Sequence, residues 1–203
     1  MKIVVLSLFL AIGWTLTIGQ NLDIRLLRDI NLGRQEKLDG TFEFLSATTY
    51  YPCIGLPILI AVAGGATKNP VIRNKGIEMG LSIMMAEGIA LGLKYTVKRK
   101  RPYETYPDVE NQGVENDPSF PSGHTSAAFS LATTLSLNFP KWYVVAPAYA
   151  WASSVAYSRV DLGLHYPSDI LVGALVGSGS SILCHYLNRK IFQKTKQKAE
   201  IQE

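Results

Sequence analysis

The chain has 203 residues, of which 47% are hydrophobic and 18% are charged, and its formal net charge is +4. This length is enough for one domain with a substantial core. The basic residues fall in short clusters between apolar segments and do not follow one periodic face. This distribution argues against nucleic-acid binding and indicates a membrane topology.

Residues 1–19 begin with a lysine near the N-terminus and continue as an apolar run that ends in small and polar residues. This pattern is typical of a secretory signal peptide, and an uncleaved first membrane helix is the alternative. Both interpretations start the chain on the inner side of a membrane and bring residue 21 to the outer side.

Residues 20–50 have the pattern of an amphipathic helical segment. Its apolar face is formed by Leu22, Leu26, Leu27 and Ile30. Gly33 follows as a stop signal. We expect this segment to pack against the side of the domain. Lying on the membrane surface, where it would help to gather a lipid substrate, is the alternative.

Residues 51–190 are expected to form the main domain, an all-α helical bundle. Its predicted helices are residues 51–66, 76–97, 122–139, 142–157 and 169–187. The third is rich in Ser, Thr and Ala and should pack inside the bundle. In the last helix, Gly173 and Gly177 predict a close helix contact. We expect a membrane-embedded bundle with five or six spanning helices. A soluble bundle is the alternative, since several segments are shorter than the ~20 residues of a full span.

Two cysteines and one carboxylate lie within these helices. Cys53 and Cys184 are expected to be free thiols at opposite ends of the bundle, packed as small apolar groups. Glu87 falls in the middle of an apolar segment, where a carboxylate is costly and usually faces the bundle interior. It is interpreted as a neutral, hydrogen-bonded structural group, with a proton path as the alternative.

Residues 158–169, SRVDLGLHYPSD, place an arginine, a histidine and an aspartate close together. Pro167 suits the first turn of a helix, so Asp169 can face His165 across one turn. Asp169 would then bond one ring nitrogen of His165 and leave the other free as a nucleophile. Arg159 supplies a forked cation suited to a phosphate.

Two further blocks precede this one. KYTVKRKRP contains Lys94 and Arg101, and PSGH contains Ser122, Gly123 and His124. Ser122 and Gly123 can offer backbone N–H donors where a helix begins, which is a natural anion site. His124 adds a second titratable group. The proline-rich loop between these two blocks, residues 99–120, is expected to border the mouth of the site or to be a solvated connector.

The order K-x6-RP, PSGH, SR-x5-H-x3-D resembles the tripartite signature of the type-2 phosphatidic acid phosphatase superfamily. This superfamily also includes class A acid phosphatases and vanadium haloperoxidases. The signature positions are filled by Lys94, Arg101, Pro102, Pro121, Ser122, Gly123, His124, Ser158, Arg159, His165 and Asp169. The resemblance covers about residues 50–190.

The resemblance implies a phosphatase. In it, His165 attacks phosphorus to form a phosphohistidine, Asp169 orients His165, and His124 protonates the leaving oxygen and then activates water. The phosphate would be held by Lys94, Arg101, Arg159, Ser122 and the Gly123 N–H. No metal site and no cofactor are expected, because cationic side chains can neutralise the phosphate. His185 lies outside every block and is interpreted as structural.

The expected substrate is a membrane lipid phosphate, and the candidates are lipid A phosphate, undecaprenyl pyrophosphate, phosphatidylglycerol phosphate and phosphatidate. A soluble periplasmic phosphatase of the class A type, a lipid phosphotransferase, a haloperoxidase and a non-catalytic lipid-binding protein are the alternatives. Threading the segments through a membrane brings all motif blocks to the outer face and leaves the basic tail, residues 191–203, inside. We therefore expect a bacterial inner-membrane protein whose active site faces the periplasm.

Overall fold

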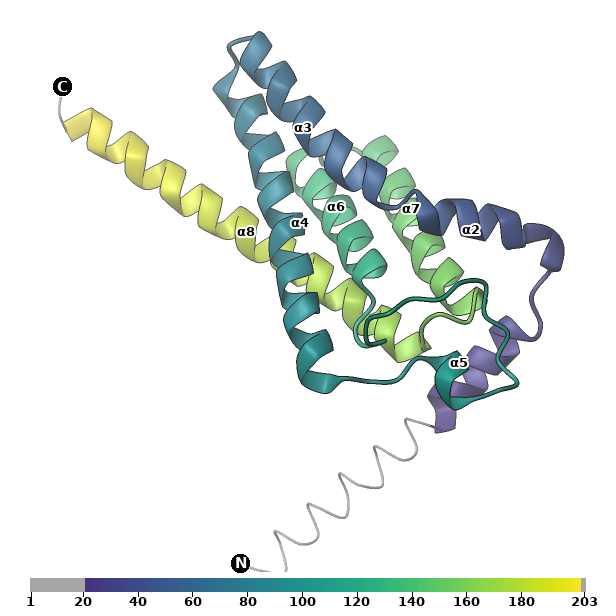
Figure 1. The fold of residues 1–203 in the computed structure, drawn as a ribbon. Coiled ribbons are helices and arrows are strands. Elements are labelled where there is room, and N and C mark those ends of the chain that lie inside the picture. The colour runs from purple at the N-terminus through teal and green to yellow at the C-terminus, as the bar shows by residue number, and fades with distance from the viewer. Residues whose placement is uncertain (1–20, 202–203) are drawn as a thin grey trace, which may run out of the picture.

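The computed structural model describes residues 21–201, and every regular element in this range is a helix (Figure 1). A helix over residues 21–31 leads to η1 (Glu36–Leu38), α2 (Asp39–Ala47), α3 (Tyr50–Ala66) and α4 (Pro70–Val97). After the short α5 (Pro102–Thr105) and a long loop come α6 (Gly123–Asn138), α7 (Trp142–Asp161) and α8 (Pro167–Ile201). The expectation of an all-α bundle is confirmed. The predicted signal peptide or first membrane helix lies outside the described residues.

The centre of the bundle is α6, which contacts α3, α4, α7 and α8. Its small hydroxyl residues are buried and are bonded to α8, for example Ser130 to Ser181 at 3.0 Å and Thr134 to Ser181 at 2.9 Å. Buried polar groups need such partners, so this sequence suits an interior helix. The expectation that this segment packs inside is confirmed.

The two glycines of α8 allow its backbone to approach α6. A Cβ on Gly173 would lie 2.7 Å from the carbonyl oxygen of Ser122, and one on Gly177 would lie 2.2 Å from that of Ser126. No larger residue fits at such distances without moving a backbone. The predicted close helix contact is therefore present, and it fixes the start of α8 beside the start of α6.

The outer faces of α3, α4 and α8 are apolar. Exposed side chains there include Ile54, Ile58, Leu59, Val62, Leu81, Met84, Leu91, Leu171, Leu175 and Ile182. An exposed apolar surface of this extent is typical of a face that contacts a membrane or a partner. We call this set the apolar belt.

By length and composition, two of the described helical stretches are suited to span a membrane, Pro70–Thr105 and Pro167–Lys190. A third is possible if Glu36–Ala47 and Tyr50–Ala66, bent by 41°, form one span. The expected five or six spans are not reached by this measure. For α6 one reason is its length, because it has only 16 residues.

The helix over residues 21–31 packs against the side of the domain, as expected, but only part of the predicted face, Leu27 and Ile30, makes the contact. Ile24 and Leu27 are buried in a cluster with Val109, Val160 and Tyr166, whereas Leu22 and Leu26, predicted to be on the apolar face, are exposed. Polar anchors decide the orientation of this helix.

One of these anchors is Asp23, whose carboxylate accepts the backbone N–H of Ser168 at 2.8 Å and the guanidinium of Arg99 at 2.7 Å. The other is Asn31, which donates to the carbonyl oxygens of Glu110 and Asp161. Both side chains are buried and bonded, so their contacts outweigh the burial of two leucines.

The cysteines agree with expectation, and the end of the last helix does not. Cys53 and Cys184 are free and buried, as expected. The last helix continues to Ile201, beyond its predicted end at Leu187.

The C-terminal ends of α4 and α7 and the N-terminal ends of α6 and α8 lie at the same end of the bundle, with α5 and the long loop beside them (Figure 1).

Candidate active site

All three motif blocks meet at this end of the bundle, each placed by a helix end. Lys94 is in the last turn of α4, Arg159 is in the last turn of α7, and Asp169 is in the first turn of α8. The buried members of the set are Lys94, Arg101, Ser122, Gly123, Arg159, His165 and Asp169, and His124 is half-buried. The structure thus brings together every residue that the sequence nominates.

The protonation of the His165 ring follows from its neighbours. Nη1 of Arg101 lies 3.2 Å from Nε2 of His165, and a guanidinium can only donate, so Nε2 presents its lone pair. The proton of a neutral ring is then on Nδ1, which lies 3.4 Å from Oγ of Ser119. The ring therefore directs an unprotonated nitrogen toward the arginines.

Neutrality of this ring is favoured by its surroundings. Burial lowers the pKa of His165 well below its ordinary value, and the charges of Arg159, Arg101 and Lys94 lower it further. Nearby Glu115 acts in the opposite direction but does not outweigh them. A neutral imidazole is the form that can act as a nucleophile.

The predicted bond between Asp169 and His165 is not direct. Oδ2 of Asp169 lies 3.6 Å from Nδ1 of His165, too far for a hydrogen bond, and accepts the hydroxyl of Ser119 at 2.5 Å instead. The same oxygen also accepts the backbone N–H of Tyr166 at 3.0 Å, which precedes α8. This contact at the helix start resembles one half of a capping box and holds the carboxylate back from the ring. Ser119 links the two side chains.

Arg99 completes the environment of Asp169. Its guanidinium donates to Oδ1 of Asp169 at 2.6 Å and lies 3.8 Å from the ring centre of Tyr166. The sequence alone does not single out Arg99 or Ser119. Arg99 lies inside the first motif block, between Lys94 and Arg101, and this position is the signal that could have drawn attention to it.

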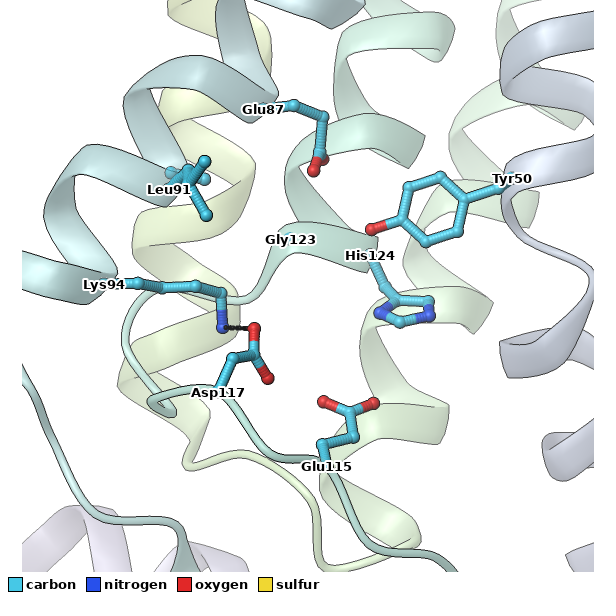
Figure 2. Close-up of a pocket in the computed structure, with 9 residues that line it drawn as sticks. Tyr50, Glu87, Leu91, Lys94, Glu115, Asp117, Gly123 and His124 are labelled. Carbon is cyan, nitrogen blue, oxygen red and sulfur yellow. Dashed lines mark ion pairs between the residues drawn. The ribbon is translucent and has the colours of Figure 1, made fainter.

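Two loop carboxylates fill the space between the cations. Glu115 bonds Arg159 through Oε1 and Arg101 through Oε2, the latter at 2.5 Å. Asp117 bonds Lys94 at 2.9 Å and Arg101 at 2.6 Å (Figure 2 shows the Lys94 pair). We call Lys94, Arg101 and Arg159 the cationic cage. Both carboxylates bind where an anion would bind.

The charge state of Glu115 reflects this position. Burial raises the pKa of the Glu115 carboxyl, but the charges of Arg159 and Arg101 outweigh burial and lower the pKa to about 2. Its Oε2 is 3.9 Å from Nε2 of His165, so the carboxylate lies next to the nitrogen that is expected to attack. The loop therefore does more than border the site or connect two helices, because its carboxylates lie inside the site.

The start of α6 has a capping role. Ser122 is the N-cap residue, and its hydroxyl oxygen accepts from the backbone N–H and the hydroxyl of Thr125. Its own backbone N–H donates to the carbonyl oxygen of Asp169 at 3.1 Å. The Ser122 N–H is therefore already used. Gly123 is the first residue of α6, where a backbone N–H has no partner within the helix.

His124 lies between two cavities. One, of about 190 Å³, is lined by Tyr50, Glu87, Leu91, Lys94 and His124 among others (Figure 2). The ring of Tyr50 packs on His124 with a centroid distance of 4.9 Å.

The other cavity, of about 540 Å³, is bordered by α2, the loop and α7. It shares His124 and Glu115 with the first cavity. The cationic cage is therefore accessible from two sides. Among the described residues, no group of three or more His, Cys, Asp or Glu side chains is arranged to hold a metal ion.

The sequence model of the PAP2 superfamily matches residues 75–193. The chain belongs to the PAP2 superfamily. It is a phosphatase of that family, and the resemblance seen in the three motif blocks is confirmed.

Relatives in the PAP2 superfamily include the undecaprenyl-diphosphatase of Sulfolobus acidocaldarius, 31% identical over 88% of this chain and 84% of that protein. The decaprenylphosphoryl-5-phosphoribose phosphatase of Mycolicibacterium smegmatis is 36% identical over 55% of this chain and 59% of that protein. Both names describe phosphatases.

Two solved structures share the fold. LpxE of Aquifex aeolicus has 30% sequence identity and a TM-score of 0.68, over 81% of this chain and 95% of that chain. A transmembrane PAP2 type phosphatidylglycerolphosphate phosphatase from Bacillus subtilis has 26% identity and a TM-score of 0.66, over 86% of this chain and 88% of that chain. The helical bundle is thus that of a PAP2 membrane phosphatase.

Proposed function

We propose that this protein hydrolyses a phosphomonoester or a pyrophosphate of a membrane lipid through a phosphohistidine, without a metal ion. The observation that carries the proposal is the position of His165. Its unprotonated Nε2 faces a cationic cage that holds two carboxylates in the place of a phosphate. Fixed cations that surround a transferring phosphoryl group stabilise the charge of its transition state.

The proposed reaction begins when the substrate phosphate displaces Glu115 and Asp117 from the cage. Nε2 of His165 forms a bond to phosphorus as the bond to the leaving oxygen breaks, and His124 donates a proton to that oxygen. Burial and the charge of Arg159 lower the pKa of His124 to about 3, and the negative charge of a bound phosphate raises this pKa again so that His124 can hold the proton. His124, now neutral, takes a proton from water as the water oxygen attacks the phosphohistidine. Inorganic phosphate leaves, His165 is regenerated, and the carboxylates return.

The positions of the remaining side chains suit this division of roles. Asp169, acting through Ser119, favours a proton on Nδ1 of His165 and stabilises the positive charge that the ring gains when Nε2 bonds to phosphorus. Arg99 fixes the carboxylate of Asp169 from the other side. The Gly123 N–H at the start of α6 is a further donor for a phosphate oxygen.

A lipid substrate is supported by two independent observations. The apolar belt covers the outer faces of helices that also end at the site, so a lipid in a bilayer could reach the cage sideways. The relatives named above include enzymes named for prenyl-linked phosphates. We propose a bacterial inner-membrane location with the site on the periplasmic side, because Lys68, Arg73 and Lys75 lie at the opposite end of α3 and α4.

The test uses the full chain purified in detergent. Phosphate release from a lipid phosphate should persist in EDTA. In a second experiment, the protein is exposed briefly to ³²P-labelled lipid and quenched with alkali and not with acid, because phosphohistidine survives base. Label should remain on the wild type and be absent from His165→Ala. Activity that requires an added divalent ion, or labelling that persists in His165→Ala, would contradict the proposal.

A further inference from the structure

The cavity between α3, α4 and the start of α6 contains a carboxylate that the proposed mechanism does not use. Glu87 lies on α4, seven residues before Lys94. Its Oε1 is buried and has no hydrogen-bond partner among the described residues. A buried carboxylate oxygen without a donor is costly, so this atom is available for a donor that a ligand would bring.

Glu87 and Tyr50 approach the same point of the site. A Cβ built on Gly123 would lie 3.5 Å from Oε2 of Glu87 and 3.4 Å from the hydroxyl oxygen of Tyr50. Both polar groups therefore lie beside the residue that precedes His124, and Figure 2 shows them on the same side of the cavity as the His124 ring. Any group next to the atom that His124 protonates would meet them.

In the proposed reaction, the leaving group enters this cavity. The phosphoryl group is held by the cage, and the lipid chain on the leaving oxygen must reach the bilayer. Leu91 lines the cavity and is also part of the apolar belt, with 53% of its surface exposed. The cavity thus leads from the cage to the lipid-facing side of α4, passing Glu87.

We infer that Glu87 is a specificity-determining residue that accepts a hydrogen bond from a hydroxyl or amino group next to the leaving oxygen. This inference rests on the proposed function and names the substrate class for the same site. It favours lipid phosphates of sugars or glycerol over prenyl diphosphates. The second phosphoryl group of a diphosphate would bring acceptor oxygens and no donor for Oε1 of Glu87, which disfavours that class.

A pair of substrates that differ by one hydroxyl tests the inference. The first is 1-acylglycerol 3-phosphate, which has a hydroxyl on the carbon adjacent to the ester, and the second is its 2-deoxy analogue. Wild-type protein in detergent should show a kcat/KM about tenfold higher for the hydroxyl-bearing lipid, since one hydrogen bond has roughly this effect. A prenyl diphosphate serves as the third substrate.

Three variants test whether Glu87 causes the preference for the hydroxyl-bearing lipid. Glu87→Leu should reduce the preference for the hydroxyl to about unity, whereas Glu87→Gln, which retains an acceptor oxygen, should keep part of it. Glu43→Gln is the matched control, because Glu43 borders the larger cavity on the other side of His124. Glu43→Gln should leave the preference for the hydroxyl unchanged. A changed preference in Glu43→Gln would instead indicate that the leaving group lies in the larger cavity.

The outcomes distinguish this inference from the proposed function. Release of phosphate from none of the three lipids would overturn the proposed function itself. Equal cleavage of the matched pair by the wild type, or a hydroxyl preference that survives in Glu87→Leu, would overturn the role of Glu87 and leave the lipid phosphatase intact. Circular dichroism of each variant shows whether the fold is retained, and Glu87→Gln supplies the test if Glu87→Leu does not fold.

Discussion

Two polar clusters lie near opposite ends of the same bundle, and each contains a histidine and a carboxylate. At the end away from the site, Glu78 is buried and accepts from Asn138 at 2.9 Å, from Asn188, and bonds Nδ1 of His185 at 2.8 Å. Its partners are two amides and an imidazole, and both carboxylate oxygens are bonded. Such a cluster is satisfied by the protein alone.

The cluster at the other end is arranged differently. The three cations of the cage share two loop carboxylates, and an oxygen of Glu87 is buried without a partner among the described residues. The ring of His165 is held neutral among positive charges. A histidine beside a carboxylate is therefore not enough by itself to indicate an active site. The cluster around His165 differs from the cluster around His185 in its excess of positive charge and in having a buried oxygen without a hydrogen-bond partner.

The strongest test of this contrast replaces each histidine in turn. His165→Ala should lower kcat by roughly 10⁴-fold or more, because it removes the proposed nucleophile. His185→Ala should keep kcat within about twofold and instead lower stability by roughly 1–3 kcal/mol, because the Glu78 carboxylate loses a buried partner. Steady-state kinetics and thermal unfolding of both variants measure the difference. Near-wild-type turnover by His165→Ala would show that the two clusters were assigned wrongly.

The next test concerns Ser119, which links His165 to Asp169. Ser119→Ala should lower kcat by about ten- to a hundredfold with little change in KM, as for other residues that orient a reacting group. Ser154→Ala is the matched control, because that hydroxyl is exposed and bonds only its own helix backbone at Ala150 among the described contacts. Single-turnover phosphate release is the measurement. An unaffected rate in Ser119→Ala would mean that Asp169 acts on His165 without this link.

A smaller effect is expected from the carboxylate in the cage. Glu115→Gln removes one negative charge beside Arg159 and Arg101, so vanadate and inorganic phosphate should inhibit about tenfold more strongly. Glu110→Gln, in the same loop but paired with Arg34, should not change inhibition. Inhibition constants measured at constant ionic strength make the comparison. Unchanged or weaker inhibition in Glu115→Gln would show that this carboxylate does not compete with the anion.

The mildest test follows the charge of His165 itself. Its pKa is lowered by burial and by neighbouring cations, so the ring should stay neutral as pH falls through about 6.5, the ordinary value for histidine. The carbon resonances of labelled histidines, followed by NMR from about pH 8 to about pH 5.5, report this. The His165 signal is identified by its absence from His165→Ala. Titration of that signal near the ordinary value would contradict the charge distribution described for the cage.

The amino-acid sequence is sufficient to predict the residues of the motif blocks, the helical class and the interior position of α6. These features are local, because each motif residue lies at or near a helix end and each pattern spans only a few turns. For this reason Lys94, His124, Arg159 and His165 can be nominated from their spacing in the chain. The burial of the two cysteines is predictable in the same way, because each lies within an apolar segment.

Only the packing of the whole chain determines which loop residues enter the site. Ser119 meets Asp169 across 50 residues, Arg159 meets Ser46 across 113, and Glu115 meets Arg159 across 44. No periodicity in the sequence encodes such pairs, because they depend on how the long irregular loop and α2 pack against the ends of the other helices. Tertiary packing also determines that Asp169 contacts His165 only through Ser119, and that Oε1 of Glu87 has no hydrogen-bond partner among the described residues.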